Sequence, residues 1–188
     1  MPRPSVITID GPVAAGKTVV GRLLAGRLGY RFLDTGLLYR AVAWAVLQEG
    51  LDVSQEEEVA ALARRLRFTV EGERVSLNGR DITDDLRDPQ VEEAVSPVSR
   101  IPGVREALLD LQREMAKNGR IVVAGRDIGT VVLPEADLKV FLQASPRERA
   151  RRRYEELRAL GRQATYEAVL GDLERRDRLD SQRRVAPL

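Results

Sequence analysis

Residues 11–18 form a loop of small residues that ends in a lysine and a threonine, GPVAAGKT, and match the pattern G-x-x-x-x-G-K-[ST]. Successive backbone N–H groups of such a loop point inward at an anion, and the following helix adds its positive end. Lys17 would reach the β- and γ-phosphates of a nucleotide such as ATP, and the Thr18 hydroxyl would be a ligand of Mg²⁺. The alternative is an ordinary strand-to-helix turn. We predict nucleotide binding by the whole loop: Gly11, Pro12, Val13, Ala14, Ala15, Gly16, Lys17, Thr18 and Val19.

One position of this loop is unusual, because Ala14 stands where a second glycine is expected. If the backbone at residue 14 needs a positive φ, the alanine costs about 1 kcal/mol there. The loop is therefore predicted to hold one strained residue if it adopts a phosphate-binding conformation.

Four short apolar runs must position this loop. Each predicts a buried strand, at residues 6–9, 30–33, 121–124 and 138–142. The segments between them carry apolar residues at helical spacing. Strands that alternate with helices indicate an α/β fold, in which helices cover both faces of a parallel sheet.

The helices are predicted from apolar spacing and from the prolines and glycines at their ends, at residues 17–28, 36–50, 54–66, 89–95, 102–119, 145–160 and 165–183. Ser54 and Glu57 are spaced as a capping box for the third of them. Residues 68–77 change to period-two alternation, with turns at 71–73 and 78–79. That change predicts a small antiparallel insert.

Polar clusters follow all four predicted strands. They are the loop 11–18, residues 34–40, residues 125–127 and the segment from residue 144 onward. In parallel sheets, ligands bind beyond the carboxyl ends of the strands. We therefore expect the clusters to converge on one site, and this convergence is a stronger indication than any single motif.

The role of the arginines in these clusters is left open by their spacing. Arg40 is either a solvated surface arginine or an anion contact, and its position favours the contact. Arg126 and Asp127 either form an ion pair within a turn or offer a bidentate cation and a carboxylate to a ligand. Residues 145–158 contain six arginines, which form either a solvated helix face or a lid over a triphosphate.

A second open case lies on the last predicted helix. Arg176, Asp180 and Arg183 are spaced i, i+4, i+7 and share one stripe of that helix. They could grip phosphate and sugar hydroxyls together, or they could form a salt-bridge ladder. Spacing alone favours the ladder.

Composition excludes several kinds of site. The chain has no cysteine and no histidine, which excludes disulfides, thiol nucleophiles, Cys/His zinc sites and imidazole bases. A net charge of +2 argues against a nucleic-acid partner, because counterion release needs a dense surface of one sign. No apolar stretch approaches the roughly 18 residues of a membrane span, and the N-terminus lacks a signal-peptide pattern. We expect a cytoplasmic monomer without nucleic-acid or membrane partners.

Five segments occur in an order that resembles the bacterial cytidylate (CMP) kinases: GPVAAGKT, DTGLLYR, SPVSRIPGVREALL, AGRDIGTVV and ERRDRLDSQRRVAPL. The resemblance covers essentially the whole chain, and its last two segments are far more specific than the P-loop. It implies the nucleoside-monophosphate kinase fold as a single kinase domain of residues 1–188. A P-loop kinase core (about 1–53 and 100–188) would carry a small antiparallel NMP-binding insert (about 54–99) and an arginine-rich helical lid (about 145–165).

The same resemblance implies ATP-dependent phosphorylation of CMP and dCMP in pyrimidine nucleotide metabolism, with Mg²⁺ as cofactor. The residues it implies for CMP binding are Ser96, Arg105 and Asp127 at the cytosine, Arg176 and Asp180 at the ribose, Arg40, Arg126 and Arg183 at the phosphate, and Thr35 near the acceptor nucleotide. The catalytic residues it implies are Lys17, Arg126, Arg153 and Arg183. Members of the family usually continue with another strand and a final helix beyond the segment that ends here at Leu188.

Three alternatives remain open from the residues themselves. One is another small-metabolite P-loop kinase of the adenylate or shikimate type. Another is a nucleotide-gated RNA-binding protein that uses the basic helices. A catalytically inactive P-loop scaffold is the third, and the intact Lys17 and Thr18 argue against it.

Overall fold

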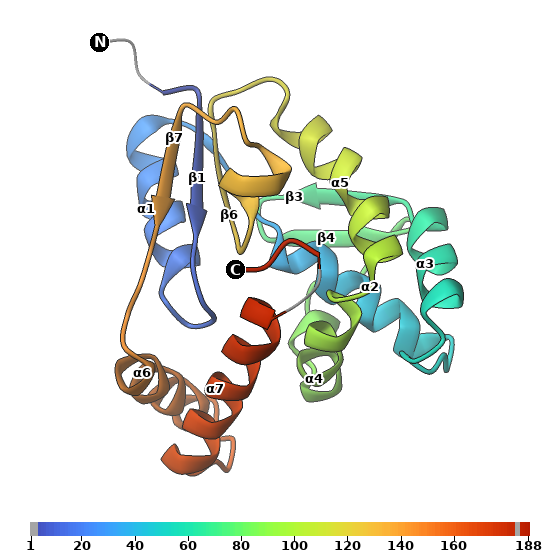
Figure 1. Cartoon of the computed structure of the whole chain (residues 1–188), viewed down its shortest axis with the longest axis vertical. Helices are drawn as coiled ribbons and strands as arrows, with labels where there is room; N and C mark the ends of the chain where they lie inside the picture. The colour runs from blue at the N-terminus through green and yellow to red at the C-terminus, as the bar shows by residue number, and fades with distance from the viewer. Residues whose placement is uncertain (1–3, 183–184) are drawn as a thin grey trace.

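A four-stranded parallel sheet forms the centre of the fold (Figure 1). The computed structural model describes residues 4–182 and 185–188. The strands lie in the order β2-β6-β1-β7, and their bounds are Val6–Asp10 for β1, Arg31–Asp34 for β2, Ile121–Gly125 for β6 and Leu138–Phe141 for β7. All four predicted strands are therefore confirmed, together with their parallel pairing.

Side chains of the sheet alternate between two apolar layers, as the pleat of a strand requires. On one face Val122 packs with Ile7 and Ile9 against α1 (Lys17–Leu28), which contributes Ala25 to the cluster. On the other face Ile121 and Val123 pack with Leu33 against α5 (Pro102–Ala116). Helices thus cover both faces, as the sequence predicted.

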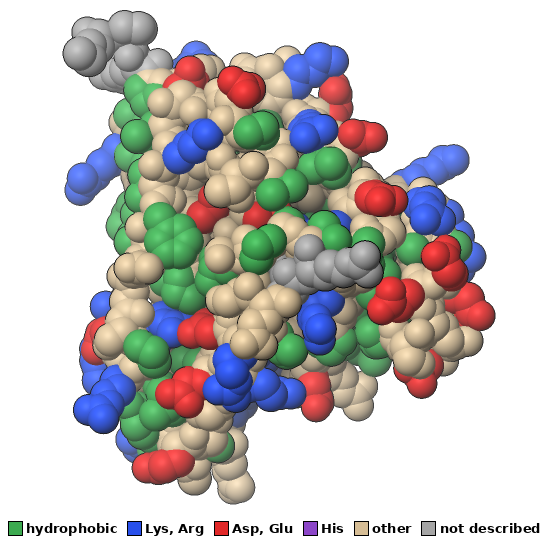
Figure 2. All heavy atoms as spheres, viewed as in Figure 1, with side chains coloured by type: hydrophobic (Ala, Val, Ile, Leu, Met, Phe, Trp, Pro, Cys, Tyr) green, Lys and Arg blue, Asp and Glu red, His purple; other side chains and the backbone are tan. Residues whose placement is uncertain are grey.

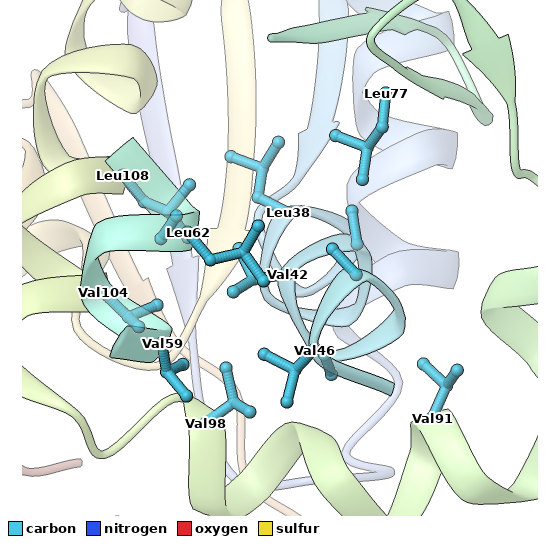
Figure 3. Close-up of a cluster of buried hydrophobic side chains, with 14 of the residues drawn as sticks. Leu38, Val42, Val46, Val59, Leu62, Leu77, Val91, Val98, Val104 and Leu108 are labelled. Carbon is cyan, nitrogen blue, oxygen red and sulfur yellow. The ribbon is translucent and has the colours of Figure 1, made fainter. Parts of the chain in front are cut away.

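The remaining apolar residues gather in a second and larger core beside the sheet. It is built by α2 (Gly36–Gln48), α3 (Glu56–Arg65), α4 (Pro89–Val98), α5 and a small antiparallel sheet. That sheet has the order β3-β4-β5, with β3 at Phe68–Glu71, β4 at Arg74–Leu77 and β5 at Arg80–Asp81. Figure 3 shows Leu38 and Val42 of α2 in this core between Leu62 of α3 and Leu77 of β4. The predicted antiparallel insert is confirmed.

Two details of the helices differ from the sequence prediction. The capping box at Ser54 and Glu57 is wrong, because α3 begins at Glu56 and no side chain caps its first turn. Instead, Asp52 accepts a hydrogen bond from the Ser54 N–H at 2.8 Å, which closes a turn ahead of the helix. The second difference is a short π-helical turn, η2 (Ile128–Val132), directly after β6, which the sequence analysis did not predict.

The arginine-rich segment forms two helices that lie beyond the carboxyl ends of the strands (Figure 1). α6 (Pro146–Ala159) begins after Ser145, whose hydroxyl accepts the Glu148 N–H at 3.2 Å. α7 (Tyr166–Gln182) packs along α6 through Ala150, Val169 and Leu173. Within the described residues, no helix is both long and apolar enough to cross a membrane.

The second core predicts a large stability effect at Leu62, whose side chain is only 1% exposed. Leu62→Ala should lower the free energy of unfolding by about 2–5 kcal/mol, because the cavity left behind cannot fully collapse. Urea unfolding followed by circular dichroism measures the change. Leu160→Ala is the matched control, because Leu160 is 62% exposed and should change stability by less than about 0.5 kcal/mol. Equal effects of the two substitutions would contradict this description of the core.

Candidate active site

The carboxyl ends of the strands meet at one edge of the parallel sheet. Asp10 at the end of β1 lies beside Gly125 of β6 and Phe141 of β7 in the strand register, and Asp34 at the end of β2 lies beside Ala124. The segments that follow these strands line two adjoining cavities with the helices α2, α4, α6 and α7. The predicted convergence of polar clusters on one edge is confirmed.

The loop 11–18 joins β1 to α1 through a backbone with positive φ angles at Gly11, Ala14 and Gly16. A side chain at residue 11 is impossible, because a Cβ on Gly11 would lie 2.1 Å from the Leu142 carbonyl oxygen. Gly16 has φ +96° and directly precedes α1, so the helix N-terminus is aimed at the loop. Ala14 has φ +57°, which confirms the predicted strain at that position. Its methyl group packs against the apolar cluster of α6 and α7, and this contact offsets part of the strain.

Lys17 is a buried cation held across the loop. Its ammonium donates to the Pro12 carbonyl at 2.7 Å across the loop, and the residue is only 9% exposed. Burial, with a smaller contribution from the nearby Arg126 cation, lowers the pKa of Lys17 to about 7 from its ordinary value of 10.5. A phosphate group beside this ammonium would favour its charged form.

Thr18 and Asp34 present oxygen atoms side by side. The Thr18 hydroxyl donates to Asp34 Oδ2 at 2.7 Å, linking the start of α1 to the end of β2. A hydroxyl and a carboxylate suit Mg²⁺, which prefers oxygen ligands and keeps several waters when it is also bound by phosphates. The described residues contain no cluster of three or more carboxylates that could hold a metal by themselves. The donor set therefore fits a magnesium ion that arrives with a nucleotide.

The arginines of α6 divide into different roles. Arg149 is 2% exposed, and its guanidinium donates to the Val13 and Ala144 carbonyls and pairs with Asp177 of α7. It therefore holds the loop and the two helices together, and has its donors engaged by protein groups. The Arg152 guanidinium pairs with Glu148 and reaches the loop, where its Nη1 would lie 3.8 Å from a Cβ on Gly16.

Glu92 of α4 is the centre of a cluster of cations. Arg153 of α6 forms an ion pair with its carboxylate, and Arg162 and Arg176 approach it at 3.7 Å. Arg176 also donates to the Glu92 carbonyl at 3.2 Å. A cleft of about 510 Å³ lies between the loop, α4, α6 and α7, and it is lined by Arg40, Arg153 and Arg176. Figure 2 shows cationic and anionic side chains interspersed around these helices.

Arg40 is an integral part of this cleft rather than a solvated arginine. It projects from α2 into both cavities, and burial lowers its pKa from the ordinary arginine value. The negative charges of Glu92 and Asp34 raise the pKa of Arg40 and so favour its charged form. The preference for an anion contact that we drew from the position of Arg40 agrees with this placement.

A smaller cavity of about 110 Å³ lies deeper, between α2, α4, α5 and the turn after β6. Arg105 and Asp127 form an ion pair in its wall, with side chains 7% and 5% exposed. The Arg105 guanidinium also donates to the Ser99 carbonyl at 3.3 Å and lies over the Tyr39 ring, 5.5 Å from its centroid. Ser96 and Thr35 line the same cavity.

The ion pair within the turn, one of the two alternatives for Arg126 and Asp127, is wrong, and their contact with a ligand stays a prediction. The two residues do not form an ion pair with each other among the contacts of the described chain. Asp127 pairs with Arg105, whereas the Arg126 Nε donates to Asp180 of α7 at 2.7 Å. Asp10 holds the turn after β6 in place, because its carboxylate accepts hydrogen bonds from the N–H groups of Ile128 and Gly129, each at 2.8 Å. Burial raises the pKa of Asp10.

The Arg176–Asp180 pair of the predicted ladder on α7 is not formed among the described residues. Arg176 pairs with Asp172, one turn earlier, at 2.9 Å, and with Glu92, whereas Asp180 pairs with Arg126. Asp180 is 6% exposed and lines the smaller cavity together with Arg176. Arg183, the third member of the predicted stripe, lies outside the described residues.

Sequence reasoning did not name Asp10 or Glu92, and it gave no individual role to Asp34, Tyr39 or Arg152, which it had placed only within larger clusters. Asp10 and Asp34 are the last residues of two buried strands, so their position next to the loop segments was a usable signal. Glu92 carried no such signal, because its partners come from α6 and α7, more than sixty positions away in the chain.

Known proteins resemble this chain over almost its whole length. The family model described as cytidylate kinase matches residues 7–188. The cytidylate kinase of Mycolicibacterium paratuberculosis is 51% identical over 188 residues, covering 97% of this chain and 82% of that protein. That of Caldanaerobacter subterraneus subsp. tengcongensis is 48% identical over 182 residues, with 97% and 81% covered. That of Bacillus subtilis is 44% identical over 186 residues, with 97% and 83% covered.

Solved structures give a weaker likeness. A shikimate kinase from Bacteroides thetaiotaomicron has a TM-score of 0.44 and 14% sequence identity, over 93% of this chain and 78% of that chain. Similarity at this level supports no argument about activity.

The buried ammonium of Lys17 predicts a pH dependence of stability. Its folded pKa of about 7 lies below the ordinary 10.5, so between these values the unfolded chain binds more protons. The contribution of Lys17 to the free energy of unfolding should therefore rise with pH across this window, by at most about 1.4 kcal/mol per pH unit. Urea unfolding of the wild type and of Lys17→Met at several pH values measures this difference. The variant should be the more stable near pH 7 and lose that advantage toward pH 10. Parallel pH curves for the two proteins would contradict the assignment.

Proposed function

The chain belongs to the cytidylate kinase family, and from this membership and the cleft geometry we infer that it transfers the γ-phosphoryl group of ATP to CMP, giving CDP and ADP. The observation that carries the acceptor assignment is the buried Arg105–Asp127 pair in the wall of the 110 Å³ cavity. A pair of opposite charges there offers both donors and acceptors to the edge of a small polar ring. The adenylate- and shikimate-type alternatives are not favoured by the family.

On the donor side, the loop 11–18 is proposed to hold the phosphates of ATP. Its backbone N–H groups and the N-terminus of α1 favour the negative charge, and Lys17 would reach the β- and γ-phosphates. Thr18 and Asp34 would hold Mg²⁺, which neutralises charge that develops on the transferring group. Arg152 and Arg153 of α6 face this region from the opposite side.

On the acceptor side, Arg40, Arg126 and Arg183 are proposed to align the phosphate of CMP, and Arg176 and Asp180 its ribose. Arg40, Arg126, Arg176 and Asp180 all line the smaller cavity. Ser96, Arg105 and Asp127 are proposed to contact the cytosine, with Thr35 beside the acceptor. The Thr35 hydroxyl donates to the Ala124 carbonyl at 2.9 Å, so it meets a ligand as an acceptor.

The reaction needs no general base. The attacking atom is a phosphate oxygen of CMP, and phosphate monoesters are largely ionised at pH 7 because their second pKa is about 6. A chain without histidine can therefore perform this chemistry. What the protein supplies is in-line positioning and neutralisation of charge, by Lys17, Arg126, Arg153 and Arg183. Before substrate binds, protein carboxylates hold these arginines at positions where the phosphates can contact them.

We further propose a division of the chain into a kinase core at about 1–53 and 100–188, an NMP-binding insert at about 54–99 and a lid at about 145–165. Closure of the lid would expel water, since water in the site would otherwise accept the phosphoryl group. We propose dCMP as a second acceptor, and a role in pyrimidine nucleotide metabolism of the cytoplasm. We also propose that the protein is a monomer and has no nucleic-acid partner.

The acceptor assignment predicts a sharp order of substrates. With ATP and Mg²⁺, the wild type should phosphorylate CMP and dCMP far faster than UMP, AMP or shikimate in an assay coupled to ADP formation. Preference for AMP or shikimate would contradict the assignment. RNA binding with a steep salt dependence, without transfer to any monophosphate, would instead favour the RNA-binding alternative.

Asp127 should affect the acceptor much more than the donor. Asp127→Asn should lower kcat/KM for CMP by about 100-fold, because a charged hydrogen-bond partner of the base is lost. The affinity for ATP, measured by calorimetry, should stay within about twofold because the loop 11–18 is untouched. Asp110→Asn, an exposed position of α5, is the matched control and should leave both quantities unchanged. Equal losses for CMP and ATP in Asp127→Asn would place Asp127 outside the acceptor site.

A further inference from the structure

Gln112 of α5 is a buried polar residue that the proposed mechanism does not use. It is 1% exposed, and its Nε2 donates to the Leu108 carbonyl one turn earlier at 3.0 Å. Its Oε1 is equally buried and accepts no hydrogen bond from any of the described residues. Such unpartnered acceptors are uncommon in folded proteins, because a buried polar atom without a hydrogen bond destabilises the fold.

The orientation of this amide is fixed by its surroundings. Rotation by 180° would place Oε1 against the Leu108 carbonyl oxygen, which would bring two acceptors together and leave the NH₂ group without its partner. The Oε1 atom therefore stays directed away from the backbone of its own helix. A hydrogen-bond donor that can satisfy it must come from elsewhere.

The position of Gln112 shows where such a donor can come from. Gln112 lines the 110 Å³ cavity that also contains Arg105, Asp127 and Ser96. It follows Arg105 by seven positions on α5, so the two side chains project from the same face of the helix. Because helical side chains lean toward the helix N-terminus, the Gln112 amide reaches back toward the Arg105–Asp127 pair. One acceptor without a partner thus borders the cavity proposed for the base.

We propose that Gln112 Oε1 accepts a hydrogen bond from the exocyclic amino group of the pyrimidine, and so helps to select cytosine over uracil. This inference rests on the proposed function of the cavity. The amino group carries two N–H bonds, which can be shared between Asp127 and Gln112. Uracil presents a carbonyl oxygen at the same ring position, which would face Oε1 as a second acceptor and leave both without a donor. Only the aminopyrimidine supplies the missing hydrogen-bond donor. Its binding therefore offsets the free-energy cost of the unpartnered amide oxygen in the free protein.

The test is Gln112→Met, which keeps the length of the side chain and removes the acceptor. The wild type is assayed first, and transfer to CMP by the wild type tests the proposed function separately from the role of Gln112. In the variant, we expect the ratio of kcat/KM for CMP to that for UMP to fall about tenfold, as for one lost hydrogen bond of about 1.4 kcal/mol. The ratio for CMP to dCMP and the affinity for ATP should not change. The melting temperature should stay the same or rise, because a buried polar group is gone.

Three outcomes would overturn the proposal. Equal losses for CMP and UMP would mean that Gln112 supports the fold or the phosphate end of the site. A changed ratio for CMP to dCMP, with the ratio for CMP to UMP unchanged, would place its partner on the ribose. An unchanged enzyme would mean that the ligand does not meet Oε1. Gln48→Met is the matched control, because Gln48 is an exposed residue at the end of α2, and it should change none of these quantities.

Discussion

The site depends on the concentration of positive charge in one partly buried cleft. Arg40, Arg126, Arg153 and Arg176 line the two adjoining cavities, and Lys17 lies near enough to Arg126 for that cation to lower its pKa. Like charges that are buried together destabilise one another and lose hydration. The folded protein holds most of them with protein oxygens: Glu92 holds Arg153 and Arg176, Asp180 holds Arg126, and the Pro12 carbonyl holds Lys17. Phosphate groups would compete with these oxygen atoms for the same cations. The cations are thus already held in the cleft before a polyanion binds.

The parallel sheet makes this concentration possible. Its register sets the ends of β1, β2 and β6 level, so the segments after them reach the same edge. Asp10 then holds the π-helical turn after β6, and this turn fixes the direction in which Arg126 and Asp127 point. The two neighbours consequently take different partners, since Arg126 turns to Asp180 of α7 and Asp127 to Arg105 of α5, and both line the smaller cavity. Arg149 of α6 links the loop 11–18 to α7, because it donates hydrogen bonds to the Val13 carbonyl and to Asp177.

The sequence predicted the framework better than the contacts. Apolar runs identified the four strands and the antiparallel insert, because strand burial leaves a local pattern. The loop 11–18 was identifiable from its motif, and a positive φ at Ala14 was expected only if the loop adopted a phosphate-binding conformation. Ion pairs were not predictable, because partners such as Arg153 and Glu92 are brought together only by helix packing. Spacing on α7 likewise suggested a pair between Arg176 and Asp180, whereas both residues pair with partners brought to them by helix packing or from another turn of α7. The buried Gln112 left no sequence signal at all.

Ligand phosphates should therefore replace protein carboxylates as partners of the cleft arginines. The most direct measurement is the ¹⁵N–¹H spectrum of the arginine Nε–H groups, with and without CMP and a non-hydrolysable ATP analogue with Mg²⁺. This replacement predicts large shifts for Arg40, Arg126, Arg153 and Arg176, while Arg149, held by Asp177 and the Val13 carbonyl, keeps its resonance position. A spectrum in which the four cleft arginines do not move, or in which Arg149 moves as far as they do, would contradict it.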